Sequence, residues 1–289
     1  MTPPQRLIDT HVHFWDPRRL RYSWLQGNPL LNRPYTAADY PAPGSDSTTE
    51  ALVFVECDTD PGQSLEEIQF VEDQARADAR IRAIVAHAPL ELGTQVEPLL
   101  ERIVTRSSRV RAIRRILQAE PDVGAVLHSP DFIAGVRLLT RFKLHFEITV
   151  NYTQMDAVID FVRTVPEVPM VLDHCGKPGI RHDEIDLFRR HARELARHSN
   201  IQCKLSGLAT EAAEGRWTEA QLLPYIDSAV EAFGPDRLLY GSDWPVCLQA
   251  ISPARWVNVL ERALQRCSPH ERQQIFHSNA NRLYRLGLA

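Results

Sequence analysis

Short apolar stretches alternate with longer amphipathic ones along almost the whole chain, and this alternation constrains the fold more than any other feature. Eight stretches have the apolar, β-rich character of strands: Leu7–His11, Ala51–Glu56, Ile81–His87, Val110–Arg114, Leu144–Val150, Val168–Asp173, Ile201–Leu205 and Arg237–Tyr240. Helical patterns lie between them: Leu65–Arg76, Val96–Thr105, Phe132–Arg141, Met155–Thr164, Ile185–His198, Glu219–Phe233 and Ala254–Cys267. Strands that alternate with helices in this way are expected to be parallel and joined by crossover helices.

Eight such units in 289 residues predict an α/β fold, a (β/α)₈ barrel. An open doubly wound sheet is the main alternative, but it usually carries a glycine-rich turn after its first strand. Here that turn reads HVHFWDP and contains no glycine, so no nucleotide-phosphate site is expected there. We expect one domain over residues 1–289 with a loop excursion at about 15–50, because Pro29–Thr49 is rich in Pro, Asn, Asp and Ser.

Composition excludes several classes of protein. The chain is 44% hydrophobic and 24% charged with a net charge of −4, and its basic residues are dispersed, so no nucleic-acid partner is expected. It has no apolar run of ~18 residues, so no membrane span is expected, and its N-terminus lacks the apolar core of a signal peptide. Five cysteines without a CxxC pair fit reduced thiols in a cytoplasmic protein. The oligomeric state stays open.

Two histidines, His11 and His13, end the first predicted strand. Alternate residues of a strand share a face, so both imidazoles can point to one site, and neutral imidazole is a good ligand for divalent metals. Because the carboxyl ends of barrel strands carry the chemistry, this position favours a catalytic site. The alternative is a pair of hydrogen-bonded histidines packed at the barrel mouth.

Asp243 follows the last predicted strand in the stretch LYGSDWP. A carboxylate there could bind a metal, accept a proton from water, or do both, and the catalytic interpretation is favoured because it completes the barrel with His11 and His13. The alternative is a residue that caps a helix or closes an Asx turn.

His174 follows the sixth predicted strand in VLDHCGKP, where it could ligate a metal, orient a substrate carbonyl or donate a proton. A structural histidine is the alternative. Adjacent residues of a strand point to opposite faces, which disfavours a nucleophilic pair with Cys175. For the same reason Asp173 is expected to point away from the site and to support neighbouring backbone.

Other polar residues at predicted strand ends are candidate contacts to substrate. Arg114 is expected to point into the barrel mouth as an anion or carbonyl clamp, while Arg115 faces outward. The remaining candidates for substrate binding are Lys204, His87, Asn151 and, from the early loop, Trp15. Lys204 could instead extend to the rim. Glu56 is either a further metal ligand or a carboxylate paired with a neighbouring base.

Five segments together resemble the amidohydrolase superfamily, and specifically its lactonase branch of sugar, sulfomucono- and pyrone-dicarboxylate lactonases. They are IDTHVHFWDP, LDHCGKP, CKLSGL, YGSDWPV and HSNANRLYRL, and the resemblance extends from Leu7 to Leu286. It implies a (β/α)₈ barrel whose catalytic core contains His11, His13, His174 and Asp243. The reaction it implies is hydrolysis of a cyclic ester by water.

The chain departs from the superfamily pattern at two strand ends. Many amidohydrolases hold two metals bridged by a modified lysine on the fourth strand, but Arg114 stands there, and the fifth strand ends in ITVNY without a histidine. We therefore expect at most one divalent metal, Zn or Mn, with His11, His13, Asp243 and Glu56 as candidate ligands. Some members of the branch hydrolyse lactones without a metal, so a metal-independent enzyme is the alternative.

The substrate is expected to be a small lactone, and a sugar aldonolactone is favoured. Aromatic residues and asparagines in the early loops suit stacking on a sugar and hydrogen bonding to it, whereas a dicarboxylate would demand several inward cations. The alternatives are a pyrone or muconolactone of aromatic catabolism, a metal-dependent decarboxylase of an aromatic acid, or a barrel without catalytic activity that serves binding.

Overall fold

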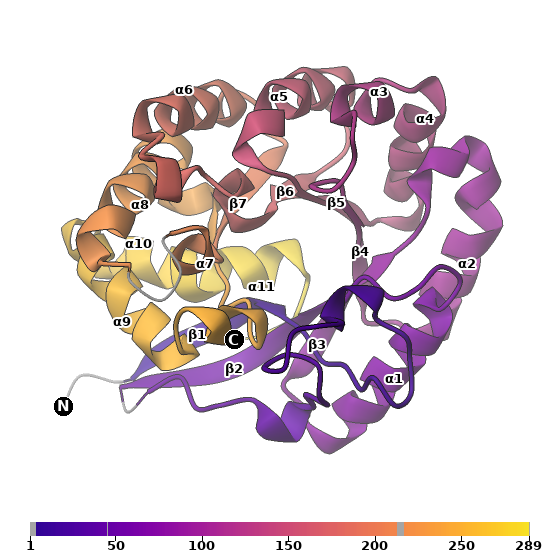
Figure 1. The fold of residues 1–289 in the computed structure, drawn as a ribbon, viewed down its shortest axis with the longest axis horizontal. Helices are drawn as coiled ribbons and strands as arrows, with labels where there is room; N and C mark the ends of the chain where they lie inside the picture. The colour runs from indigo at the N-terminus through magenta and orange to yellow at the C-terminus, as the bar shows by residue number, and fades with distance from the viewer. Residues whose placement is uncertain (1–3, 45, 213–216, 289) are drawn as a thin grey trace.

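The computed structural model describes residues 4–44, 46–212 and 217–288, and its strands form one parallel sheet in chain order. The strands are β1 (Gln5–Val12), β2 (Ser47–Val55), β3 (Ile81–His87), β4 (Val110–Ile116), β5 (His145–Thr149), β6 (Met170–Leu172), β7 (Ile201–Leu205) and β8 (Leu238–Tyr240). Figure 1 shows them as a central ring with the helices outside. The predicted (β/α)₈ barrel is confirmed.

The helices that cover the barrel follow the predicted alternation. They are α1 (Ser64–Ala77), α2 (Glu97–Arg106), α3 (Val123–Leu127), α4 (Pro130–Leu138), α5 (Met155–Thr164), α6 (Ile185–Ala196), α7 (Leu208–Glu211), α8 (Glu219–Phe233), α9 (Pro253–Ala263), α10 (Pro269–Gln273) and α11 (Asn279–Leu283). The sequence analysis missed the short helices α3, α7, α10 and α11, which are too brief for a clear helical period. None of the helices in the described residues is long and apolar enough to cross a membrane.

Strand β6 is shorter than the predicted Val168–Asp173. Pro169 has no N–H to contribute to the sheet, so the strand begins at Met170. At its other end the chain leaves the extended conformation, because His174 and Cys175 adopt left-handed backbone angles, with φ of 54° and 53°. This turn decides which way the residues after β6 point.

The barrel closes between β1 and β8 through a short seam rather than a long ladder. Val12 forms an isolated parallel bridge with Trp244, the N–H of Asp243 donates to the carbonyl of His11 at 2.9 Å, and that of His13 donates to Trp244 at 2.8 Å. The buried carboxylate of Asp9 accepts hydrogen bonds from the N–H of Ser242 (2.8 Å) and that of His11 (3.2 Å). Closure of the barrel therefore brings the histidines of the first strand beside Asp243.

The inside of the barrel has an apolar part and a charged part. The apolar part consists of small and branched residues, mainly from β1 to β4, closed at the bottom by Tyr284 and Leu286: Ile8, Ala51, Val53, Val55, Ala83, Val85, Ala112, Val171 and Leu239. The charged part comes from β4 to β7 and contains Arg114, Glu147, Asp173 and Lys204, all buried. Buried charges are stable only when they are paired, so this part is organised by ion pairs.

Removing the Asp9 carboxylate should loosen the seam. We expect Asp9→Ala to lower the free energy of unfolding by about 2–4 kcal/mol, because it leaves buried N–H groups without an acceptor. Tyr40→Phe is the matched control: it removes only the hydroxyl that donates to Asp9 at 2.8 Å and should cost about 1 kcal/mol. Urea unfolding of the three proteins measures both values, and equal stability of Asp9→Ala and the wild type would contradict this role.

Candidate active site

A cavity of about 350 Å³ opens at the carboxyl ends of the strands. Its floor contains His13, Arg114, His174 and Asp243, and its rim contains Trp24, Asp58, Gln118, Lys177, Glu211 and Gln249. A (β/α)₈ barrel holds its active site at this end, so the cavity is the candidate site.

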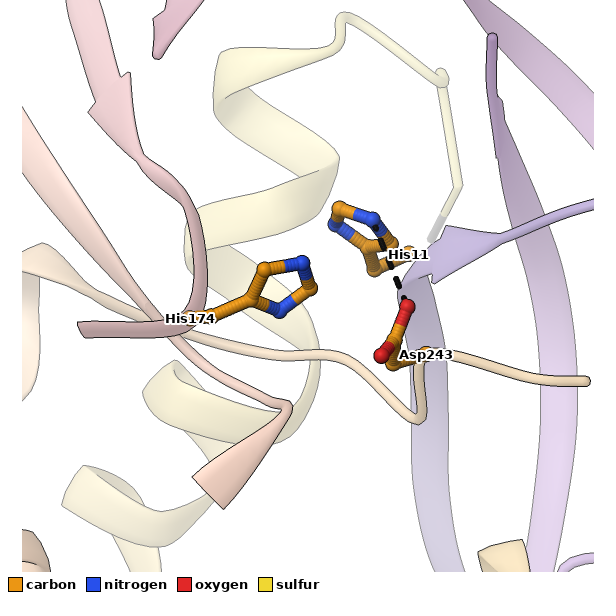
Figure 2. Close-up of side chains that lie close together, drawn as sticks. All are labelled: His11, His174 and Asp243. Atoms are coloured by element: carbon orange, nitrogen blue, oxygen red, sulfur yellow. Dashed lines mark ion pairs between the residues drawn. The ribbon is translucent and has the colours of Figure 1, made fainter. Parts of the chain in front are cut away.

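Three side chains from distant parts of the sequence converge at the floor of this cavity: His174 and Asp243, which line it, and His11 next to them (Figure 2). One ligand atom from each lies within 4.8 Å of the others, and all three residues are buried. His11 Nε2 is 3.7 Å from Asp243 Oδ1, and the rings of His11 and His174 are 4.4 Å apart between centroids. The structure therefore brings together three of the four residues predicted for the catalytic core.

His174 is held in place by Ser206 and Gly207, which directly follow β7. Its Nδ1 is 2.8 Å from the hydroxyl of Ser206, which leaves Nε2 as the nitrogen available to the site. Gly207 has a φ of 66°, and a Cβ on it would lie 2.7 Å from His174 Nδ1, so only glycine fits there. Ser206 and Gly207, the SG pair of the CKLSGL segment, thus fix the position of the His174 ring.

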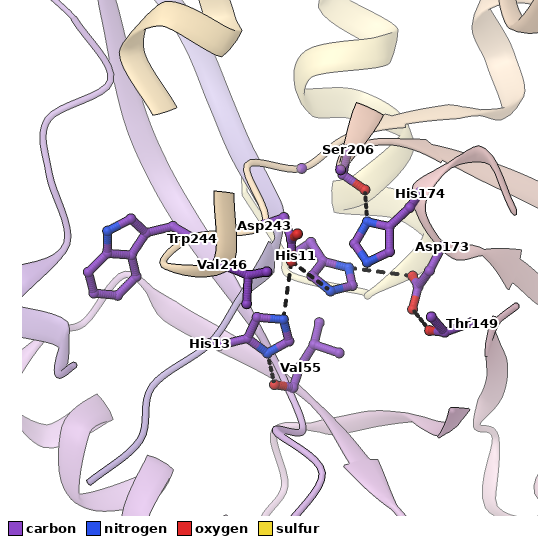
Figure 3. Close-up of polar contacts among 12 residues, drawn as sticks. His11, His13, Val55, Thr149, Asp173, His174, Ser206, Asp243, Trp244 and Val246 are labelled. Carbon is purple, nitrogen blue, oxygen red and sulfur yellow. Dashed lines mark hydrogen bonds and ion pairs between the residues drawn. The ribbon is translucent and has the colours of Figure 1, made fainter. Parts of the chain in front are cut away.

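His13, the fourth predicted residue, lies beside Asp243 but outside the group of three. Its Nδ1–H donates to the carbonyl of Val55 at 2.8 Å, and its Nε2 is 3.4 Å from Asp243 Oδ1 (Figure 3). In a neutral ring with Nδ1 protonated, Nε2 carries a lone pair, and it then faces another acceptor. A proton or a cation between the two atoms would make this contact favourable.

The protonation states of the three residues suit metal binding. Burial lowers the pKa of His174 to about 4 and that of His11 well below its usual value, so both rings are neutral near pH 7. Burial by itself would raise the pKa of Asp243, but His174 and His13 outweigh it and hold that pKa well below its usual value. The site therefore offers two imidazole nitrogens and one ionised carboxylate.

This donor set fits one divalent cation such as Zn²⁺, which in catalytic sites takes three protein ligands and keeps one position open. The surrounding charges agree with such a cation. The buried ionic cluster, which we define as Glu56, Glu147, Asp173, Asp243, Arg114 and Lys204, holds four carboxylates against two cations. A divalent cation would balance this excess of negative charge.

Comparison with known proteins identifies the family. The family model described as amidohydrolase matches residues 8–286. The chain belongs to the amidohydrolase family. It is 35% identical over 292 residues to an L-fucono-1,5-lactonase of Burkholderia multivorans, covering 96% of each chain. It is 22% identical to an L-rhamnono-gamma-lactonase of Scheffersomyces stipitis, covering 97% of this chain and 99% of that protein.

A solved structure extends the likeness to three dimensions. The crystal structure of an amidohydrolase from Burkholderia multivorans with bound zinc superimposes with a TM-score of 0.87 at 33% sequence identity. The match covers 97% of this chain and 99% of that one. The fold described above is therefore shared along nearly the whole length of both chains.

Arg114 points into the barrel of this amidohydrolase as expected, and Arg115 faces outward to Glu91 and Glu120. However, Arg114 is already engaged. Its Nε donates to Glu56 Oε1 at 2.7 Å, another of its nitrogens donates to the Glu56 carbonyl, and a third lies 3.5 Å from Asp173. The carboxylate of Glu56 is thus bound to the guanidinium, and its role as a metal ligand stays a prediction.

Lys204 lies below the cavity floor and not at its rim. Its side chain is fully buried, and its ammonium contacts Glu147 and lies 3.1 Å from Asp173 Oδ1. The expectation that Lys204 contacts substrate is therefore corrected: two buried carboxylates hold its ammonium inside the barrel.

The other predicted substrate contacts also lie away from the cavity. Trp15 is fully buried and donates from its indole N–H to the carbonyls of Leu31 and Arg33. His87 contacts the hydroxyl of Ser64 at 3.3 Å, and the Asn151 amide donates to the Gln118 carbonyl at 3.1 Å. These three expectations are corrected, because structural hydrogen bonds engage the side chains. Trp24 is the tryptophan that reaches the cavity.

Sequence reasoning missed Asp173, which was expected to point away from the site. Asp173 continues the inward face of β6 that Val171 occupies, and the left-handed turn at His174 brings the next side chain inward as well. Glu147 was also missed as a member of the ionic cluster. The signal for it was the charged residue inside the apolar run LHFEITV, which needs a buried partner.

Metal binding can be tested directly. After chelator treatment we expect the protein to take up one equivalent of Zn²⁺. His174→Asn should weaken this binding more than ~100-fold, because loss of a residue that only hydrogen-bonds to a ligand already lowers metal affinity by about 10–100-fold. His270→Asn, at an exposed position of α10, is the control and should bind as the wild type does. Isothermal titration calorimetry gives both affinities. Equal affinities would remove His174 from the ligand set.

Glu67 on α1 should make stability depend on pH. Its buried carboxyl accepts the N–H of Cys57 at 2.9 Å, and burial together with Glu56 raises its pKa from 4.5 to about 8. Between these values the unfolded chain binds fewer protons than the folded one, so the free energy of unfolding falls as pH rises. We expect Glu67→Gln to abolish this loss, gaining up to about 1.4 kcal/mol per pH unit over the wild type. Urea unfolding near pH 5 and near pH 8 measures the gain, and a pH-independent difference would contradict it.

Proposed function

We propose that this amidohydrolase is a lactonase that hydrolyses the cyclic esters of sugar acids. One observation carries the proposal: an ionised carboxylate, Asp243, stands beside two neutral histidines at the floor of a cavity of about 350 Å³. Ester hydrolysis needs a base for water and polar groups that stabilise the developing oxyanion. The likeness to an L-fucono-1,5-lactonase along 96% of the chain supports the same reaction.

In the proposed reaction Asp243 accepts a proton from the attacking water, whose oxygen forms a bond to the lactone carbonyl carbon. The carbonyl electrons move to its oxygen. When they return, the ring C–O bond breaks and the leaving alkoxide takes the proton back from Asp243. Return of this proton to the alkoxide leaves Asp243 ionised again for the next turnover. One water is consumed, and the product is an open hydroxy acid.

His174 and His11 support the carbonyl side of the reaction. His174 presents Nε2 to the cavity because Ser206 engages Nδ1. A divalent cation held by His11, His174 and Asp243 would supply Lewis acidity toward the carbonyl oxygen. His13, fixed by Val55, borders Asp243 on its other side and limits the directions from which water can approach.

The charge of the cavity favours a neutral substrate. Among the described residues that line it the cations are Arg114 and Lys177, and both are paired: Arg114 with Glu56, and Lys177 with Glu211 at 3.3 Å. A lactone that carries two carboxylates would have to break these pairs. The amides of Gln118 and Gln249 and the indole of Trp24 suit the hydroxyls and the apolar face of a sugar lactone. This favours aldonolactones over the anionic lactones of aromatic catabolism.

The cysteines support a cytoplasmic, reducing environment for this enzyme. All five are free thiols, and four of them are buried: Cys57, Cys175, Cys203 and Cys247. A place in carbohydrate catabolism follows from the proposed substrate, since ring opening converts the lactone of an oxidised sugar into its free acid.

A panel of lactones tests the proposal. In a pH-indicator assay of acid release we expect turnover of L-fucono-1,5-lactone and related sugar lactones and little turnover of 2-pyrone-4,6-dicarboxylate. Asp243→Asn should lower kcat by ~10²–10⁴-fold, the range for loss of a general base. Asp186→Asn, an exposed carboxylate on α6, is the control and should keep full activity.

Three results would contradict it. Normal turnover by Asp243→Asn would remove this residue from the role of base. Turnover confined to anionic lactones would overturn the substrate class. Release of carbon dioxide from an aromatic acid, with no lactone opened, would replace the lactonase with a decarboxylase.

A further inference from the structure

Asp173 directly follows β6, and its carboxylate lies beside His11 (Figure 3), while its side chain is not among the described ones that line the cavity. It is fully buried. Its Oδ2 accepts a hydrogen bond from the Thr149 hydroxyl at 2.8 Å and lies 3.5 Å from an Arg114 nitrogen. Its Oδ1 lies 3.5 Å from His11 Nδ1 and 3.1 Å from the Lys204 ammonium. One oxygen therefore anchors the carboxylate, and the other faces the histidine.

The oxygen that faces His11 needs a donor. Within the described residues Asp173 Oδ1 is a buried acceptor that no directed hydrogen bond satisfies, although Lys204 lies close enough for an ion pair. Lys204 is drawn to the other side by Glu147, which also accepts the Tyr284 hydroxyl at 2.5 Å. An N–H on His11 Nδ1 would satisfy the buried oxygen and remove the cost of leaving it unpaired.

The two nitrogens of His11 have different surroundings. Nδ1 lies 3.5 Å from Asp173 and 3.4 Å from the Lys204 ammonium, and Nε2 lies 3.7 Å from Asp243 and 3.4 Å from an Arg114 nitrogen. Lysine and arginine only donate, so the two cations do not distinguish the nitrogens. The carboxylates do: Asp243 lines the cavity, where water can donate to it, whereas the Asp173 oxygen is enclosed and lacks a directed hydrogen bond from the described part of the chain. This difference places the single ring proton on Nδ1.

We propose that Asp173 is a positioning residue that accepts the Nδ1–H of His11 and so holds the Nε2 lone pair toward Asp243 and His174. This inference rests on the proposed function, because it assigns His11 a fixed tautomer for that reaction. Asp173 touches neither substrate nor metal; it acts through the imidazole. Such partners fix both the tautomer and the orientation of the ring, and their loss typically costs 10–100-fold in activity or metal affinity.

Histidine ¹⁵N NMR tests the tautomer without any reaction. In chelator-treated wild-type protein the His11 signals, assigned by their loss in His11→Asn, should show the Nδ1–H form. In Asp173→Asn we expect the Nε2–H form, because Lys204, 3.4 Å from Nδ1, can then donate to the exposed lone pair. Glu67→Gln, another buried acid changed to its amide but remote from His11, should keep the wild-type pattern.

Kinetics supply the second measurement. Asp173→Asn should lower kcat about 10–100-fold and change KM by less than about threefold, and Glu67→Gln should do neither. An Nε2–H signal in the wild type, an unchanged signal in Asp173→Asn, or an equal loss of kcat in both variants would overturn the proposal. The wild-type spectrum decides the tautomer even if Asp173→Asn does not fold.

Failure of this inference and failure of the proposed function are distinguishable. The expected NMR pattern in a protein that opens no lactone would support the role of Asp173 and contradict the lactonase. An active lactonase with an Nε2–H tautomer at His11 would contradict the role of Asp173 alone.

Discussion

The hydrogen bond from the Asp243 N–H to the His11 carbonyl is the contact on which the rest of the structure depends. It belongs to the seam that closes the barrel between the first and last strands, and it also sets the spacing between the two ends of the candidate site. Asp9 strengthens the same seam from the outside of the barrel by binding the backbone of both strands. Folding and assembly of the site are therefore one event, because the barrel cannot close without bringing Asp243 to His11.

The ionic cluster explains how so many charges can lie inside one barrel. Arg114 and Lys204 each contact more than one carboxylate, so every cation is shared, and Asp173 is contacted by both of them. Sharing keeps the side chains rigid but leaves the cluster with excess negative charge. That excess lies beneath the three residues that suit a divalent cation. The buried ion pairs of the barrel and the residues that suit a cation therefore belong to one charged cluster.

The sequence was sufficient to predict the barrel, because alternation of strands and helices is a local pattern that appears in the order of residues. It also predicted His11, His174 and Asp243, since each follows an apolar strand and the fold gathers strand ends at one place. Partnership between side chains was not predictable in the same way. Glu56 and Lys204 follow the same strand-end rule, but the structure pairs them with Arg114 and with Glu147. Such pairing depends on distances across the barrel that the order of residues does not reveal.

Asp173 shows a second limit. Its predicted direction rested on the assumption that His174 points inward by the alternation of an extended strand. The strand ends at Leu172, and a left-handed turn brings His174 inward instead, so that Asp173 keeps the inward face of Val171. Gly207, two residues after the end of β7, accommodates this turn, because the His174 ring occupies the space that a Cβ would need there.

The excursion after β1 ties the wall of the cavity to the support of Asp243, the proposed base. Trp15 and Tyr35 pair within it, Tyr35 and Tyr40 pack on Trp244 next to Asp243, and Trp24 projects from it to the cavity rim. The wall of the cavity and the backbone next to Asp243 are therefore supported by one aromatic cluster, which contains Trp15, Tyr35, Tyr40 and Trp244. A family member that acquired a new specificity by exchanging this whole segment would have to rebuild the support of Asp243 as well. Trp24 belongs to this aromatic cluster, because its ring packs on that of Trp15. Replacement of single rim residues outside the cluster, such as Gln118, is the route that leaves it intact, and diversification among these enzymes is expected to follow it.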